Sequence, residues 1–212
     1  LRRSRGLGDV YKRQLYQIPI SLFEQSVLRK VSVHLGFQVP TKLPILDEWR
    51  EMADKVDTLE EEVRIAMVGK YTGLSDSYLS VIKALQHSAF AVGRKLQIDW
   101  IESTDLDPND RTENHEEAWR MLESADGILV PGGFGNRGVE GKIAAANYAR
   151  VNEVPYLGVC LGLQIATIEF CRNVLNIQSA NSAEFDEDAP VHAVVFMPEI
   201  SKTQMGGTMR LG

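Results

Sequence analysis

The sequence predicts an α/β fold in which a parallel sheet carries helices on both faces. From residue 63 onward, short apolar runs alternate with longer segments of helical periodicity. That alternation is typical of strand–helix–strand units, which join parallel strands. Two glycine-rich turns, at residues 132–135 and 158–162, each follow an expected strand. Ligands bind beyond the carboxyl ends of such strands, so these turns are where we expect a site.

The expected elements follow from the apolar pattern of each segment. Residues 63–69 form a short apolar run that ends in glycine, as a buried parallel strand does. The expected strands are residues 63–69, 96–101, 125–130 and 155–159, and the expected helices are residues 77–91, 114–124, 138–152 and 161–176. No internal repeat or low-complexity tract interrupts this order.

The segment before residue 63 has a different texture. Residues 16–20 are expected to be extended because Pro19 disfavours a helix. Ser21, with Glu24 three residues later, forms a capping box that predicts a short helix. Residues 47–62 are charged and helix-like, which predicts a linker helix with a solvated face.

The first 14 residues are expected to be non-native. They are basic and match no periodic template, and residues 4–14 match the translation of a transposon-derived sequencing adapter. A targeting peptide or a basic arm are the alternatives, but no amphipathic helix pattern follows. We therefore expect the reading frame to start inside a gene, after the native N-terminal portion.

Composition excludes several classes of protein. Of the 212 residues, 44% are hydrophobic and 25% charged, which is ordinary for a globular protein. The apolar runs are far shorter than the roughly 20 residues that span a bilayer, and the net charge of −6 argues against nucleic-acid binding. Two cysteines without a secretory signal fit a reducing cytosol, so a cytoplasmic location is expected.

The sharpest motif is the pentapeptide GVCLG at residues 158–162, which has the form G-x-C-x-G at a strand-to-helix junction. With serine, the same turn is the nucleophile elbow of hydrolases. The helix that follows favours a thiolate at Cys160, and the Leu161 amide is placed to stabilise an oxyanion. A buried structural cysteine between packing glycines is the alternative. Cys171 lies inside the same expected helix and is interpreted as an inert core thiol.

The second glycine-rich turn favours the catalytic interpretation. In PGGFG at residues 131–135, an unhindered backbone lets amides converge on an anion or a carbonyl oxygen. A plain turn would explain this segment on its own. The combination with a cysteine turn is more specific than either part.

At this point the residues resemble the class I glutamine amidotransferases, and in finer detail the CTP synthase family. The resemblance runs from Leu15 to Gly212, and Ala183 stands where the family usually has threonine. The matching segments are residues 65–71, 76–85, 131–135, 137–141, 158–164, 181–185 and 206–212. The resemblance implies a three-layer, flavodoxin-like domain at residues 63–212 that is truncated at its C-terminus. It also implies a synthetase-domain remnant at residues 15–46, before the linker helix.

That family converts UTP to CTP with ATP and Mg²⁺, using ammonia released from glutamine, and GTP stimulates the release. The resemblance implies a homotetrameric parent, with no metal or cofactor held by this segment. It assigns the nucleophile to Cys160 and the oxyanion hole to the amides of Gly133 and Leu161. Residues implied to bind L-glutamine are Gly133, Phe134, Leu161, Gln164 and Glu184, and those near the GTP-responsive region are Arg137, Thr208 and Arg210. A solvated acidic loop around Glu184 and a surface role for Arg137 are the alternatives.

A cysteine nucleophile of this kind needs a histidine base and an acid that orients it. None of the four histidines lies in a His-x-Glu pattern, and no phosphate-binding G-x-x-x-x-G-K-[ST] or metal-ligand cluster occurs. The family's His-Pro-Glu segment would lie beyond Gly212, so the printed chain is expected to be nearly inactive. The competing hypotheses are another class I amidotransferase and a non-catalytic glutamine- or nucleotide-sensing module.

Overall fold

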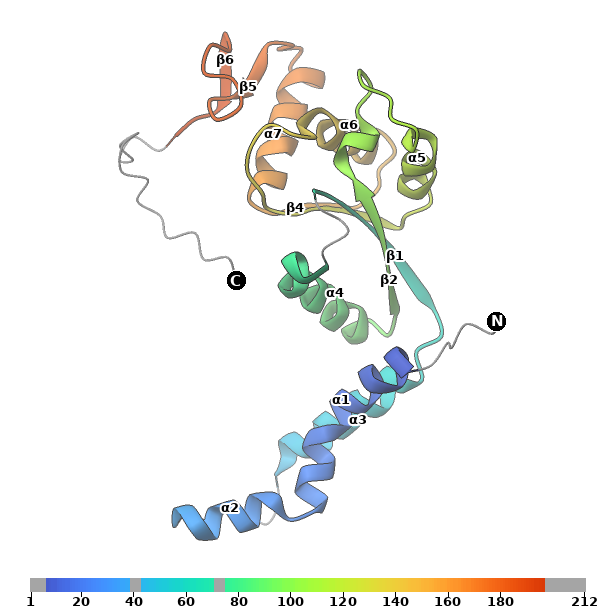
Figure 1. Cartoon of the computed structure of the whole chain (residues 1–212), viewed down its shortest axis with the longest axis vertical. Coiled ribbons are helices and arrows are strands. Elements are labelled where there is room, and N and C mark those ends of the chain that lie inside the picture. Colours follow the sequence, from blue (N-terminus) through green and yellow to red (C-terminus); the bar gives the residue numbers. More distant parts are fainter. Residues whose placement is uncertain (1–6, 39–42, 71–74, 197–212) are drawn as a thin grey trace. The chain divides into compact units, whose positions relative to one another are not determined.

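The computed structural model describes residues 7–38, 43–70 and 75–196 (Figure 1). Contacts divide the chain into two compact units. The first comprises Leu1–Glu62 with Gln86–Lys95, and the second comprises Val63–Leu85 with Leu96–Gly212. Both glycine-rich turns fall in the second unit.

The second unit is built on a four-stranded sheet with the strand order β2-β1-β3-β4. Its strands are β1 (Glu62–Gly69), β2 (Lys95–Glu102), β3 (Gly127–Val130) and β4 (Tyr156–Gly158). β3 runs parallel to both neighbours, with Ile65 opposite Gly127 on one side and Val130 opposite Gly158 on the other. The expectation of a parallel-sheet α/β fold is confirmed.

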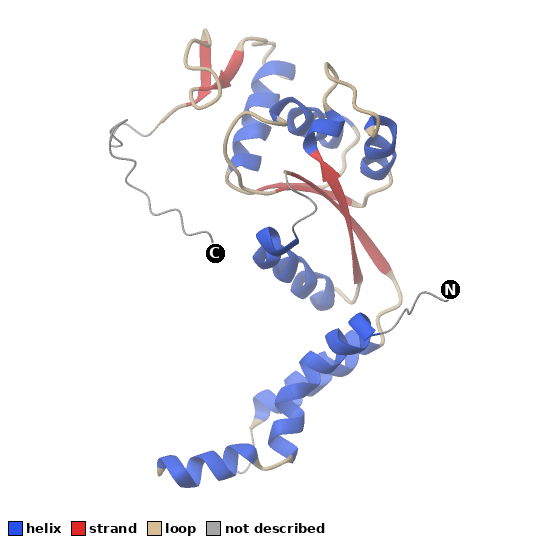
Figure 2. Cartoon of the chain, in the orientation of Figure 1, coloured by secondary structure: helices blue, strands red, loops and turns tan. Residues whose placement is uncertain are grey.

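Helices alternate with these strands along the chain, as Figure 2 shows. They are the 3₁₀ helix η1 (Ser75–Tyr78), α4 (Leu79–Ala91), the 3₁₀ helix η2 (Ser103–Leu106), α5 (His115–Glu123), α6 (Val139–Val151) and α7 (Leu161–Asn173). A separate two-stranded parallel sheet follows, formed by β5 (Ala180–Ser182) and β6 (Val191–Val194). The sequence pattern predicted neither of these two strands, because each is only three or four residues long.

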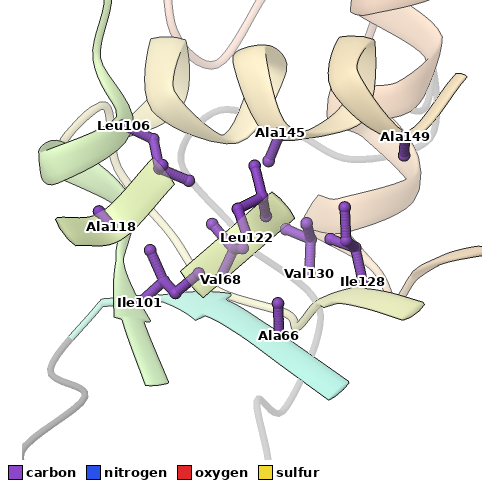
Figure 3. Close-up of a cluster of buried hydrophobic side chains, with 10 residues drawn as sticks. All are labelled: Ala66, Val68, Ile101, Leu106, Ala118, Leu122, Ile128, Val130, Ala145 and Ala149. Atoms are coloured by element: carbon purple, nitrogen blue, oxygen red, sulfur yellow. The ribbon is translucent and has the colours of Figure 1, made fainter. Parts of the chain in front are cut away.

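One hydrophobic cluster fixes α5 and α6 on a face of the sheet (Figure 3). The sheet contributes apolar side chains from β1, β2 and β3, and α6 contributes alanines that allow its backbone to approach closely. The cluster consists of Ala66, Val68, Ile101, Leu106, Ala118, Leu122, Ile128, Val130, Ala145 and Ala149. Leu122 is fully buried, which stabilises the fold by about 1.5–3 kcal/mol.

A second cluster joins α6 to α7 and thereby positions the start of α7. It consists of Val139, Ile143, Ala146, Leu161, Ile165 and Ile168. Leu161, the residue after Cys160, is 1% exposed and belongs to this cluster. The nucleophile turn is therefore anchored by the core on its helical side.

The first unit contains α1 (Leu7–Glu24), α2 (Val27–Leu35) and α3 (Pro44–Asp57). The expectation that residues 16–20 are extended is wrong, because Pro19 lies inside α1. Packing against α3 explains the difference: Ile20 and Ala53 are buried, and the Trp49 indole donates a 2.7 Å hydrogen bond to the Tyr16 carbonyl. These contacts offset the backbone hydrogen bond that a proline removes.

Other boundaries shift by a few residues. The expected helix at residues 47–62 is α3, which begins at Pro44 and ends at Asp57. Glu62 already starts β1, and Gly36 ends α2 with a left-handed backbone (φ 71°). In the described part of the chain, no helix is long and apolar enough to cross a membrane.

Candidate functional site

Cys160 occupies a strained turn between β4 and α7. Its φ of 52° and ψ of −105° lie outside the ordinary regions for a residue with a side chain, and the residue is exposed. Such a conformation costs roughly 1–3 kcal/mol and is typical of functional turns. The prediction of a nucleophile-type turn therefore has a direct structural counterpart.

Both flanking glycines are required by close backbone approach. A Cβ added to Gly158 would lie 2.4 Å from the Gly162 carbonyl carbon. A Cβ added to Gly162 would lie 2.1 Å from the Val130 carbonyl oxygen. Neither distance is tolerated by real side chains, so the turn admits glycine alone at these two positions without rearrangement.

Tyr156 is hydrogen-bonded to the first turn of α7. Its hydroxyl donates a 2.9 Å hydrogen bond to the Gly162 carbonyl. Burial, with a smaller contribution from the Glu169 carboxylate, raises the pKa of Tyr156, so the phenol keeps its proton and remains a donor. In the turn itself, Gly162 N–H donates to Val159, and Leu163 and Gln164 donate to the Cys160 carbonyl.

The glycine turn after β3 lies directly beside the thiol. A Cβ added to Gly132 would be 3.4 Å from Cys160 Cβ and 4.0 Å from Cys160 Sγ. A Cβ added to Gly133 would be 3.5 Å from Leu161 Cδ2. The structure therefore brings together the two turns that carry the predicted oxyanion hole, although they are far apart in sequence.

The peptide group between Phe134 and Gly135 is held on both edges. Lys70 Nζ donates to the Phe134 carbonyl at 2.7 Å and to the Gly135 carbonyl at 2.9 Å. On the opposite edge, the Gly135 N–H donates to Glu184 Oε1 at 3.4 Å. Hydrogen bonds to charged groups are stronger than neutral ones, so this pair of residues fixes the orientation of the turn.

Two of the predicted glutamine-binding side chains, Gln164 and Phe134, have unusual surroundings. Gln164 Oε1 is buried and has no hydrogen-bond partner among the described residues. Phe134 is 56% exposed although it is a large apolar residue. Native structures pair nearly all buried polar atoms, so an amide oxygen without a partner, one helical turn after Cys160, is unusual.

A cavity of about 260 Å³ is lined in part by the glycine turn. It is lined by Gly69, Lys70, Tyr78, Pro131, Gly132, Gly133, Phe134 and Lys142. Lys142 is 2% exposed. Burial, together with the nearby Lys70 charge, lowers the pKa of Lys142 to about 8, while Glu102 opposes the shift.

The predicted GTP-responsive residues divide into two groups. Arg137 forms a 2.8 Å ion pair with Glu102, and Thr208 and Arg210 lie outside the described residues. Arg137 also lowers the pKa of Lys70, after burial as the main cause. Cys171 is partly buried in α7 rather than fully buried in the core.

No side chain of the described residues hydrogen-bonds to the Cys160 thiol. His192 instead contacts the Asp186 carbonyl at 3.1 Å. Within the described ranges, no group of three or more histidine, cysteine or acidic side chains is arranged to hold a metal ion. The site as described thus offers a nucleophile, amide donors and cations, but no visible base.

A strained cysteine at the end of a parallel strand, beside an open glycine turn, defines a class of protein: α/β proteins with the turn that in hydrolases carries the nucleophile. Comparison with known families is more specific. Residues 73–212 match the family described as "Glutamine amidotransferase class-I". The chain belongs to this family.

Curated relatives carry a narrower name. The chain is 53% identical to human "CTP synthase 1" over 93% of its own length and 34% of the relative. It is 48% identical to "CTP synthase" of Dictyostelium discoideum over 98% of its length and 39% of the relative. The chain therefore spans somewhat more than a third of these relatives.

A solved structure supports the same fold. The glutaminase domain of Trypanosoma brucei CTPS with bound acivicin is 45% identical and superposes with a TM-score of 0.60. The match covers 66% of this chain and 53% of that one. At this identity, the similarity concerns sequence as well as fold.

Sequence reasoning missed the cationic side of the site. Lys70 and Lys142 were not predicted as site residues, nor was Tyr78, whose hydroxyl donates to the Lys70 carbonyl at 2.6 Å. A lysine directly after a buried strand, with a second lysine in an alanine-rich helix, was the available sign. That the two lysines are buried is visible only in the packed structure.

Proposed function

We propose that this chain is the glutamine-hydrolysing part of a CTP synthase, with Cys160 as the nucleophile. The observation that carries the proposal is the strained Cys160 turn, whose thiol lies beside Gly132: a Cβ added to Gly132 would be 4.0 Å from the sulfur. Family membership and roughly 50% identity to proteins named CTP synthase support the same function.

In the proposed reaction, the Cys160 thiolate attacks the side-chain carboxamide carbon of L-glutamine. The carbonyl π electrons move onto oxygen, and the amides of Gly133 and Leu161 stabilise that oxyanion. When the carbonyl re-forms, the C–N bond breaks, and the nitrogen takes up the proton that the Cys160 thiol gave up and leaves as ammonia. Water then hydrolyses the glutamyl thioester, which restores the thiol and releases glutamate.

Substrate recognition is assigned to groups around the turn. Glu184 would pair with the α-ammonium of glutamine, and the unsatisfied Gln164 Oε1 would accept a hydrogen bond from the substrate. Phe134, exposed in the described structure, would cover the substrate's methylene groups. Because Glu184 now accepts the Gly135 N–H at 3.4 Å, it is already close to the turn.

The whole protein would convert UTP to CTP with ATP and Mg²⁺, using the ammonia released here. GTP would act as an activator near Arg137, Thr208 and Arg210, and the parent would be a homotetramer in the cytoplasm. The ATP, UTP and Mg²⁺ sites would belong to another domain. This part of the proposal is supported by the relatives' names and by the resemblance of residues 15–46 to a synthetase domain.

Acivicin, a glutamine-mimicking electrophile, tests the proposal without requiring turnover. The full 212-residue chain is incubated with acivicin, and modified cysteines are located by peptide mapping. We expect labelling of Cys160 that L-glutamine slows, while Cys171 stays unmodified. Iodoacetamide, which carries no amino-acid group, serves to measure thiol exposure alone.

Glu184→Gln provides the matched variant. Loss of a charge-assisted hydrogen bond is worth about 1.5–3 kcal/mol, so acivicin labelling should slow by roughly 10- to 100-fold. Labelling by iodoacetamide should not change, and Asp188→Asn in the same loop should leave both rates unaltered. Equal modification of both cysteines, or no protection by glutamine, would contradict the proposal and favour a non-catalytic module.

A further inference from the structure

We propose that the cavity lined by Lys70, Lys142 and the glycine turn is a binding site for a small oxyanion of the phosphate class, held by the two lysines. The cavity is lined by the end of β1, Tyr78 of η1, the turn after β3 and the first half of α6. Both lysines line it, and both are more than nine-tenths buried, at 8% and 2% exposure. Cys160 itself does not line this cavity, although Gly132, Gly133 and Phe134 of the adjoining turn do.

The two ammonium groups differ in what they already bind. The Lys70 ammonium has three N–H donors, two of which donate to the Phe134 and Gly135 carbonyls. The Lys142 ammonium has no hydrogen bond or ion pair with any described residue. At least one donor of Lys70 and the donors of Lys142 therefore remain for a ligand in the cavity.

The surrounding charges leave the cavity cationic. The groups that act on the two lysines are Arg137, Glu102 and Glu184. Glu102 is paired with Arg137 at 2.8 Å, and Glu184 accepts from the Gly135 amide. Three cations thus face two carboxylates, each of which already has another partner.

Burying an unpaired ammonium is costly unless a counter-ion or hydrogen-bond acceptor compensates it. With a pKa of about 8, Lys142 still carries its charge at neutral pH. A tetrahedral oxyanion has enough acceptor oxygens to bind both ammonium groups at once. The glycines at 69, 132 and 133 present no side chain that would exclude it.

The size of the cavity selects a small ligand. Its volume is about 260 Å³, whereas a water molecule occupies about 30 Å³ of the liquid, so an inorganic phosphate fits with some water. A complete nucleoside triphosphate is too large to be enclosed. The proposal therefore commits to a free oxyanion rather than to the phosphate of a nucleotide.

Inorganic phosphate is the probe for the test. Thermal unfolding of the full chain is followed at pH 7 and constant ionic strength while phosphate replaces chloride. We expect a saturable rise in Tm, because a ligand that binds only the folded state stabilises it. Lys142→Met and Lys142→Gln should weaken apparent phosphate affinity by roughly tenfold or more, as expected for loss of a charged hydrogen bond.

Lys30→Met, which removes an exposed lysine of α2, is the control and should leave the phosphate response unchanged. Raising the pH to 9.5, above the pKa of Lys142, should weaken binding to the unsubstituted chain. No saturable response, or a response that both Lys142 variants retain, would overturn the proposal. A Lys142-dependent response to ATP but not to phosphate would also overturn it, in favour of a nucleotide phosphate.

Discussion

Replacing Lys142 by methionine should stabilise the fold, although it removes a buried side chain with many contacts. Methionine has a similar length and no charge, so it fills the same space in α6 without an unpaired ammonium. The cost that it removes can be worked out from the structure. Burial lowers the Lys142 pKa from 10.5 to about 8.

That difference sets the magnitude. Each unit of pKa difference between the folded and unfolded chain is worth about 1.36 kcal/mol, so burying the charge costs about 3 kcal/mol at pH 7. The shift is the net effect of burial, of repulsion by Lys70 and Arg137 and of attraction by Glu102, so this value is the whole cost of the charge. Lys142→Met should therefore raise the free energy of unfolding by up to about 3 kcal/mol.

The same pKa difference makes the stability of the unsubstituted chain depend on pH. Between pH 8 and 10.5 the unfolded chain keeps a proton on Lys142 that the folded chain has released. The unfolding free energy of the unsubstituted chain therefore rises with pH across this window, relative to the variant. The advantage of Lys142→Met should be full at pH 7 and should have largely vanished above pH 10.5.

Urea denaturation at pH 7 and at pH 10, followed by tryptophan fluorescence, measures both quantities. The buffers must contain no phosphate, because an anion bound at Lys142 would hide the cost of its charge. Lys30→Met is again the control and should leave the unfolding free energy unchanged within about 0.5 kcal/mol. A variant that is less stable at pH 7, or a difference that does not depend on pH, would refute the assignment of Lys142 as an uncompensated cation.

Two further predictions concern packing. Gly162→Ala would place a Cβ 2.1 Å from the Val130 carbonyl oxygen. The variant should therefore lower the free energy of unfolding by about 1–3 kcal/mol, although alanine favours helices. Urea titration measures the change, and a more stable variant would contradict the prediction. The Arg172 side chain is 16% exposed and donates to both carboxylate oxygens of Glu140 and to the Ala180 carbonyl. Arg172→Ala should therefore lower the free energy of unfolding by about 3 kcal/mol, whereas Arg120→Ala, in an exposed ion pair, should lower it by under about 1 kcal/mol. Equal losses in Tm for the two variants would contradict this difference.

The parts of the fold that follow from local pattern were predictable. β3 is a continuous apolar segment, β1 is apolar from Ile65 to Gly69, and helical segments separate the strands, so their order implied the parallel sheet. The error at residues 16–20 has a different origin. Pro19 correctly opposes a helix locally, but the contacts of Tyr16 and Ile20 with α3 are not visible in the pattern. Tertiary packing decided that segment.

The candidate site divides in the same way. Backbone atoms approach Gly158 and Gly162 too closely to admit a side chain. The spacing of these two glycines around a cysteine makes that requirement visible in the sequence. The proximity of Gly132 to Cys160 depends on β3 and β4 being neighbours, which the strand–helix alternation favours without fixing. Thus the two turns were predictable singly, and their contact required the strand order.

Lys70 and Lys142 illustrate what the sequence cannot express. A lysine is exposed in most proteins, so neither residue type nor spacing indicates that its charge is buried. The register of β1 against β3 carries Lys70 to the carbonyls of the glycine turn, and the packing of α6 carries Lys142 to the same cavity. Because desolvation depends on every surrounding element, a shifted pKa is a property of the assembled fold. The cationic cavity is therefore where the structure adds most to the sequence.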